Sequence, residues 1–152
     1  MSHESTQLSV GQINLVVADV AASVAFYRRL GFTVDEAKAP GWAQHHAAAS
    51  MANGLRLEMD SREFAAQWNP GLKSSPGYSG FVLFVTVPLR NMVDDLFERM
   101  RSGGSPVQKD PEDAFWGARY AIIEDPDGNS VGIMSPMDET QRYVPPMPPS
   151  KA

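Results

Sequence analysis

Amide and ionisable side chains alternate with apolar ones in two segments of the chain, the pattern that places side chains on one face of a strand. Gln12 and Asn14 alternate with apolar residues in the first segment, and Arg56 and Glu58 do so in the second. A carboxylate held on such a face can act as a general base, and Glu58 is the only candidate base. The alternative for Glu58 is an ion pair with Arg56, two residues away on the same face.

Composition excludes several kinds of chemistry. The 152 residues include no cysteine, so disulfides, thiolate metal sites and thiol nucleophiles are excluded, and a reducing cytoplasmic location is expected. The net charge of −5 disfavours nucleic acids and anionic membranes as partners. It fits either a cationic ligand or plain solubility. No P-loop, GxGxxG, GxSxG or HExxH motif occurs.

No segment of the sequence resembles a membrane or export signal. No apolar run approaches the roughly 20 residues that a membrane-spanning helix needs. The first nine residues are polar and lack the basic and apolar regions of a signal peptide. We expect them to form a flexible leader.

The first sixty residues predict a strand, a helix and three further strands. The strands are predicted at residues 12–17, from Phe32, at Trp42–Met51 and at residues 55–59. The helix is predicted up to Leu30, with Asp19 or Ser23 as its N-cap and Gly31 as the C-terminal glycine. Asn53-Gly54 indicates a hairpin between the last two strands.

The same order of elements recurs later in the chain. A strand is predicted at residues 81–87, a helix at residues 91–101 and a short strand from Val107. The turn Asp125-Pro126-Asp127-Gly128 then joins two strands of a hairpin within residues 115–136. Corresponding positions of the two helices lie about 70 residues apart, which indicates two similar modules that pack together.

The predicted boundaries follow from this repeat. Module 1 spans residues 10–60 and module 2 spans residues 80–136. Residues 61–79 are a linker, with a short helix that stops near Asn69. The proline-rich residues 137–152 are expected to be extended or disordered.

The doubled βαβββ order, the FYRRLGF segment and the EDPDGN turn resemble the vicinal oxygen chelate superfamily over roughly residues 10–136. This superfamily includes glyoxalase I, extradiol dioxygenases and bleomycin-resistance proteins. The resemblance implies an α+β fold in which two βαβββ modules form a curled mixed sheet around a cavity. It also implies a homodimer in many members.

In metal-using members, the resemblance implies four ligands, two from each module. Gln12 and Glu58 match the two positions of module 1. Module 2 lacks both, because residues 81–85 contain no His, Gln, Asp or Glu and Gly132 stands where a glutamate is usual. Two donors are too few for a catalytic divalent ion, so no metal or other cofactor is expected.

A metal site in module 1 alone is the alternative. Neighbouring residues of a strand point to opposite faces, so only one of His45 and His46 can join such a site. With His46 facing inward, Gln12, His46 and Glu58 would form a three-ligand site for Ni, Zn, Mn or Fe. The protein would then be a lyase, isomerase or dioxygenase of the same superfamily, or a metal-free isomerase that uses Glu58.

The loss of ligands makes the chain resemble the metal-free bleomycin-resistance-like members most closely. That resemblance implies binding of a small organic molecule between the modules, for sequestration or antibiotic resistance. The candidate ligand-binding residues are Gln12, Asn14, Trp42, His46, Arg56, Glu58, Phe84, Phe115, Trp116 and Gly132. Trp116 either stacks on a planar ligand or packs at the module interface. Gly132 either allows close approach of a ligand or backbone, or marks a bulge.

Overall fold

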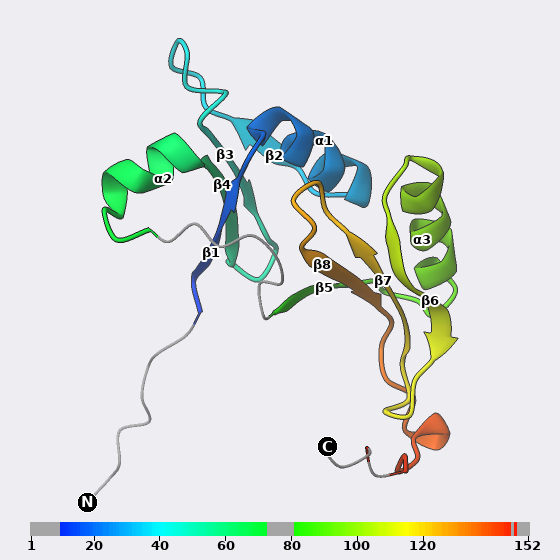
Figure 1. The fold of residues 1–152 in the computed structure, drawn as a ribbon. Coiled ribbons are helices and arrows are strands. Elements are labelled where there is room, and N and C mark those ends of the chain that lie inside the picture. Colours follow the sequence, from blue (N-terminus) through cyan, green and yellow to red (C-terminus); the bar gives the residue numbers. More distant parts are fainter. Residues whose placement is uncertain (1–9, 73–80, 147, 149–152) are drawn as a thin grey trace, which may run out of the picture. The chain divides into compact units, whose positions relative to one another are not determined.

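The computed structural model describes residues 10–72, 81–146 and 148. Its contacts divide the chain into two compact units, Met1–Ser75 and Pro76–Ala152. Each unit contains one four-stranded mixed sheet (Figure 1). The predicted α+β class with two βαβββ modules is therefore confirmed. No helix in the described ranges is long and apolar enough to cross a membrane.

The N-terminal unit pairs its strands in the order β1-β4-β3-β2. β1 runs parallel to β4, whereas β3 is antiparallel to both of its neighbours. Its elements are β1 (Gln12–Val17), α1 (Val20–Leu30), β2 (Val34–Glu36), β3 (His46–Ser50), β4 (Arg56–Ser61) and α2 (Arg62–Trp68).

One face of this sheet packs against α1. The apolar members of the β1 and β4 alternation are buried, and so are the α1 residues at helical spacing. These core side chains are Leu15, Val17, Leu57 and Met59 from the sheet and Val20, Val24, Phe26, Tyr27 and Leu30 from α1. The polar residues of the same strands therefore lie on the opposite face of the sheet.

Both ends of α1 are capped as two of the sequence signals indicate. Asp19 is the N-cap, and its carboxylate accepts a hydrogen bond from the backbone N–H of Ala22 at 3.1 Å. Ser23, the other candidate, is buried inside the helix. Gly31 adopts φ 122°, and both its N–H and that of Phe32 reach the Tyr27 carbonyl.

The strand predicted at Trp42–Met51 is wrong at its start. Residues 42–45 form a turn, in which the backbone N–H groups of His45 and His46 both donate to the Trp42 carbonyl. The strand begins only at His46. Trp42 and Gln44 therefore precede β3 and do not take part in its alternation.

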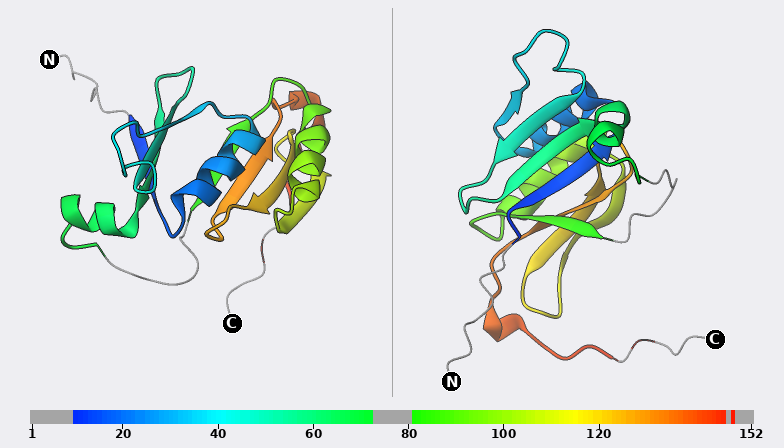
Figure 2. Two further views of the ribbon diagram at one scale, coloured as in Figure 1. Left: turned by 90° about the horizontal axis from the view of Figure 1, so that it is seen from above. Right: turned by 90° about the vertical axis from the view of Figure 1, so that its left-hand side faces the viewer.

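The helix predicted near Asn69 is confirmed as α2. Ser61 caps it by accepting a hydrogen bond from the Phe64 N–H at 3.1 Å. α2 contacts β1 and β4. Figure 1 and the left view of Figure 2 place it on the side of the sheet away from α1. This segment is thus part of the N-terminal unit's packing, and it reaches the polar face.

The C-terminal unit repeats the plan with the strand order β5-β8-β7-β6. α3 contacts β6, β7 and β8 and buries Val93, Phe97 and Met100. β6 is longer than predicted and continues past Pro111 with irregular register. The elements are β5 (Val82–Thr86), α3 (Met92–Ser102), β6 (Val107–Asp113), β7 (Arg119–Glu124), β8 (Ser130–Met134) and η1 (Glu139–Gln141).

The hairpin predicted between β7 and β8 is confirmed, and its turn depends on Asp125. One oxygen of this buried carboxylate accepts hydrogen bonds from the backbone N–H groups of Asp127 and Asn129, both at 2.9 Å. The other accepts from the Asn129 side chain. Gly128 takes φ 82°, which a glycine adopts without strain.

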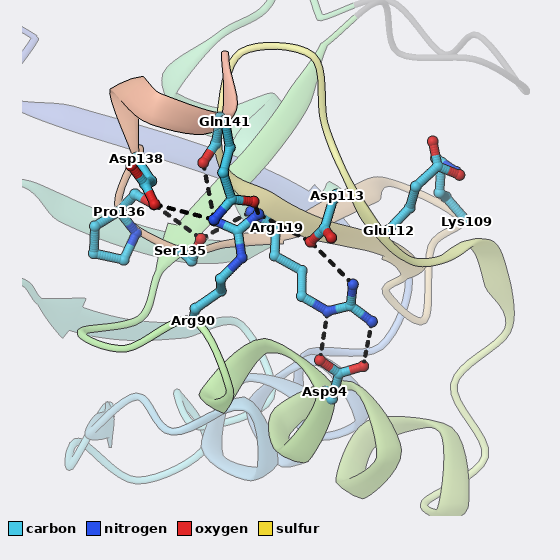
Figure 3. A network of polar contacts seen from close by, with 11 residues as sticks. Arg90, Asp94, Lys109, Glu112, Asp113, Arg119, Ser135, Pro136, Asp138 and Gln141 are labelled. Carbon is cyan, nitrogen blue, oxygen red and sulfur yellow. Dashed lines mark hydrogen bonds and ion pairs between the residues drawn. The ribbon is translucent and has the colours of Figure 1, made fainter.

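The prediction of an extended or disordered tail from residue 137 is wrong for residues 138–143. Asp138 N–H donates to the Gly117 carbonyl and Tyr143 N–H donates to the Phe115 carbonyl. Arg90 adds side-chain hydrogen bonds to the Gly117 carbonyl and to Gln141 (Figure 3). These contacts attach η1 and its flanking residues to the C-terminal unit.

Candidate functional site

The polar face of the N-terminal sheet gathers residues from three strands. The pairing register sets Asn14 beside Glu58, and His46 beside Asp60. Since side chains alternate along each strand, those at these positions share the face opposite α1. Gln12, Arg56 and Ser50 extend this face by the same register.

A pocket of about 280 Å³ opens on this face. Its lining combines polar sheet residues with two aromatic residues of α2, namely Gln12, Asn14, His46, Glu58, Asp60, Phe64 and Trp68. Four of these lining residues are predicted candidates: Gln12, Asn14, His46 and Glu58.

Asp60 lies at the centre of the hydrogen bonding in this pocket. Its side chain is only 2% exposed. One carboxylate oxygen lies 2.6 Å from His46 Nδ1, and the other accepts a hydrogen bond from Asn14 Nδ2 at 2.9 Å. The Asn14 oxygen in turn accepts from Gln12 Nε2 at 2.6 Å. Asp60 therefore fixes side chains from β1 and β3 relative to β4.

Glu58 lies between a histidine and an arginine. Its Oε1 is 3.6 Å from His46 Nε2, and its Oε2 is 3.3 Å from Arg56 Nε. The ion pair with Arg56, expected as the alternative role of Glu58, is therefore present. The Arg56 side chain is about half exposed and also reaches Ser50, so it lies at the rim of the pocket.

Aromatic side chains form the wall contributed by α2. The Phe64 ring meets the rings of Trp42 and His46 edge-on, with centroids 5.1 and 5.9 Å away. Trp42 therefore supports the wall from the turn before β3 and does not line the pocket. Trp68, which is 49% exposed, completes the wall at the end of α2.

Several possible metal ligands of this face are already engaged within the protein. His46 Nε2 and Glu58 Oε1 are close enough to share an ion. However, Glu58 already pairs with Arg56, and both oxygens of Asp60 are engaged by His46 and Asn14. Within the described residues, no three His, Asp or Glu side chains are grouped to hold a metal ion. Gln12, the third ligand of the alternative site, lines the same pocket, and its Nε2 donates a hydrogen bond to Asn14.

The structure explains why position 132 in the C-terminal unit is a glycine, and the explanation differs from both sequence-based alternatives. It is in regular register with both Phe84 and Ile122, so no bulge occurs there. The Phe84 ring covers the glycine so closely that a Cβ would lie 2.2 Å from Phe84 Cε1. A side chain of this protein therefore fills the space beside Gly132.

Trp116 belongs to an aromatic cluster of the C-terminal unit. Its Nε1 donates to the Met134 sulfur at 3.3 Å, and its ring contacts those of Phe115 and Tyr120. Phe115 and Trp116 also line a second pocket of about 380 Å³, to which the C-terminal segment contributes Tyr143. Phe115 and Trp116 therefore line a different pocket from the predicted ligand-binding residues of the N-terminal unit.

Sequence reasoning missed three residues of the polar pocket. Asp60 continues the alternation of Arg56 and Glu58 by two residues. Phe64 and Trp68 are spaced by four on a predicted helix, which places them on one face. Asp60 lies one residue beyond the strand predicted at residues 55–59, and the assignment of residues 61–79 to a linker left out Phe64 and Trp68.

The fold of two βαβββ units is that of the glyoxalase class of proteins. Residues 9–133 match the family model described as "Glyoxalase/Bleomycin resistance protein/Dioxygenase superfamily". The chain belongs to this superfamily.

Relatives and solved structures agree with this assignment. The uncharacterized protein Mb0911c of Mycobacterium bovis is 29% identical over 131 residues, which cover 83% of this chain and 82% of that protein. A glyoxalase-related enzyme from Fulvimarina pelagi shares the fold, with a TM-score of 0.72 at 21% identity over 84% of this chain and 88% of that one. A glyoxalase/bleomycin resistance protein/dioxygenase family enzyme from Burkholderia phytofirmans also shares the fold. Its TM-score is 0.71 at 20% identity, over 84% of this chain and 98% of that one.

Proposed function

We propose that this protein binds a small organic molecule in the polar pocket of the N-terminal unit and acts by holding it. The observation that carries the proposal is the joining of hydrogen-bonding side chains from three strands with an aromatic wall in one pocket. Ligand sites combine apolar or aromatic surface with a few fixed polar groups in this way. Sequestration of an antibiotic or another toxic compound is the role that fits such binding.

Hydrogen bonds and ring contacts within the protein fix the positions of the side chains that line the pocket. Asp60 is buried and bonded on both oxygens, and Phe64 contacts both His46 and Trp42. Pre-ordered side chains lose little conformational entropy when a ligand binds, which favours affinity. The size of the pocket suits one ring of a ligand.

A thermal-shift screen of antibiotics, diols and α-keto compounds tests the proposal, because a ligand that binds the native state raises its melting temperature. Hits are then titrated by calorimetry against Glu58→Gln, which alters the pocket, and Glu36→Gln, which lies on β2 outside the pocket lining. Binding that weakens only in the Glu58 variant supports the proposal. A screen without hits contradicts it.

Metal analysis addresses the enzymatic alternative with the same two variants. Stoichiometric Ni, Zn, Mn or Fe in the purified protein, lost in Glu58→Gln and retained in Glu36→Gln, would contradict a purely binding role. We also propose that the protein is a homodimer, which light scattering after size-exclusion chromatography tests directly.

A further inference from the structure

We propose that Asp60 makes the pocket a hydrogen-bond acceptor for its ligand, and that the ligand is therefore an organic cation with paired N–H donors, such as an amidinium or a guanidinium. This inference rests on the proposed binding function and names the chemical class that the pocket selects. It follows from the direction of the two hydrogen bonds that Asp60 accepts.

The first of these bonds fixes the tautomer of His46. A carboxylate accepts hydrogen bonds and has no hydrogen to donate, so His46 Nδ1, 2.6 Å from Asp60 Oδ1, carries the hydrogen. In a neutral imidazole the other nitrogen is then an acceptor. Since His46 lines the pocket, its Nε2 lies beside Glu58, where the neutral ring presents a lone pair.

The second bond orients the two amides of β1. Because Asp60 Oδ2 can only accept, Asn14 must turn its NH₂ group toward Asp60 and its oxygen toward Gln12. Gln12 donates a hydrogen bond from its Nε2 to that oxygen. Both amides therefore direct an N–H group into the protein network.

Glu58 adds the second acceptor and the negative charge. Its Oε1 lies 3.6 Å from His46 Nε2, which is longer than a hydrogen bond, so one planar group can reach both atoms. The two nitrogen atoms of one amidinium can each donate to one of them. Charge-assisted bonds of this kind are stronger than neutral ones.

The remaining charges and rings of the pocket fit a planar cation. Asp60 and Glu58 are both acidic, whereas Arg56, the basic partner of Glu58, lies at the rim. Phe64 and Trp68 offer aromatic faces, and such faces attract cations. A carboxylate ligand would instead meet the Glu58 carboxylate.

Benzamidine and benzoate test this inference, because they share one ring and differ in charge and hydrogen-bond polarity. Calorimetric titration of the wild-type protein should detect benzamidine binding and no benzoate binding. Asp60→Asn keeps the shape of the side chain but can donate to His46 Nδ1, which turns Nε2 into a donor. We expect it to weaken benzamidine binding about tenfold or more. Asp35→Asn, exposed on β2, is the matched control and should not change it.

A second measurement uses the wild-type protein and needs no variant. The ¹⁵N chemical shifts of His46 in the wild-type protein should show a protonated Nδ1 and an unprotonated Nε2. The opposite tautomer, or benzoate binding as tight as that of benzamidine, would overturn the inference and leave the proposed function intact. If neither benzamidine nor benzoate binds, the inference is overturned as well. The proposed function is contradicted only if the thermal-shift screen also gives no hit.

Discussion

The Phe84 ring occupies the space where residue 132 would carry a side chain. The two residues are partners on neighbouring parallel strands, and a Cβ on Gly132 would lie 2.2 Å from the ring. In the superfamily that this chain resembles, a metal-binding glutamate is usual at this position. A glutamate here would have to displace an aromatic ring as well as replace a hydrogen atom.

Gly132→Ala should therefore destabilise the protein, because the Phe84 ring must leave its place over β8. We expect a loss of about 1–3 kcal/mol in the free energy of unfolding, measured by denaturant titration. Phe84→Ala removes the ring and therefore the clash. The double variant should lose clearly less free energy of unfolding than the sum of the losses in the two single variants. Strictly additive losses would contradict this account.

Gly117 is another described position where an added Cβ would clash with a neighbour. It adopts φ 91°, and a Cβ would lie 2.4 Å from the backbone oxygen of Asp138. Gly41→Ala is the matched control, since Gly41 has φ 82° but no described atom within 4 Å of its Cβ position. Gly117→Ala should lower the free energy of unfolding by at least about 1 kcal/mol more than the control does. Equal losses would show that backbone strain alone matters.

The two long helices differ in the side chain at the N-cap, and this difference gives a matched pair of variants. Asp19 accepts a hydrogen bond from the first turn of α1, whereas Asn91 makes no side-chain capping bond in the described structure of α3. Asp19→Ala should cost about 1 kcal/mol of stability, and Asn91→Ala should cost much less. Thermal unfolding of both variants measures this, and equal shifts would refute the role of Asp19.

The Asp94–Arg119 pair predicts a weak dependence of stability on acid pH. Arg119 donates to both oxygens of Asp94 at 2.6 and 2.9 Å, and these bonds lower the pKa of Asp94 below its ordinary value of 3.8 (Figure 3). The unfolded chain then binds more protons, so the contribution of this pair is complete above about pH 4 and is lost as the pH falls through the folded-state pKa.

The size of this effect is limited by solvent, because the Asp94 side chain is 46% exposed. We expect less than about 1 kcal/mol. Asp94→Asn should reduce the loss of stability between about pH 5 and pH 2.5 in urea titrations, whereas Asp95→Asn, exposed on the same helix, should not. A steeper loss in the Asp94 variant would contradict the assignment.

Features that depend on near neighbours could be predicted from the order of amino acids alone. Alternation predicted β1, helical spacing predicted α1 and α3, and turn residues such as Asp125 and Gly128 predicted the hairpin between β7 and β8. Each signal lies within a few residues, and the physics that it reports, a cap, a turn or an amphipathic face, is equally local. The repeat of these signals was enough to indicate the superfamily.

Which side chains meet depends on how the strands pair in the folded protein. Asp60 joins Asn14 and His46 because parallel pairing with β1 and antiparallel pairing with β3 set the register across three strands. Phe84 reaches Gly132 across about fifty residues of sequence for the same reason. Register is set by the whole packed sheet and by its turns, so no short segment contains the information that brings these residues together.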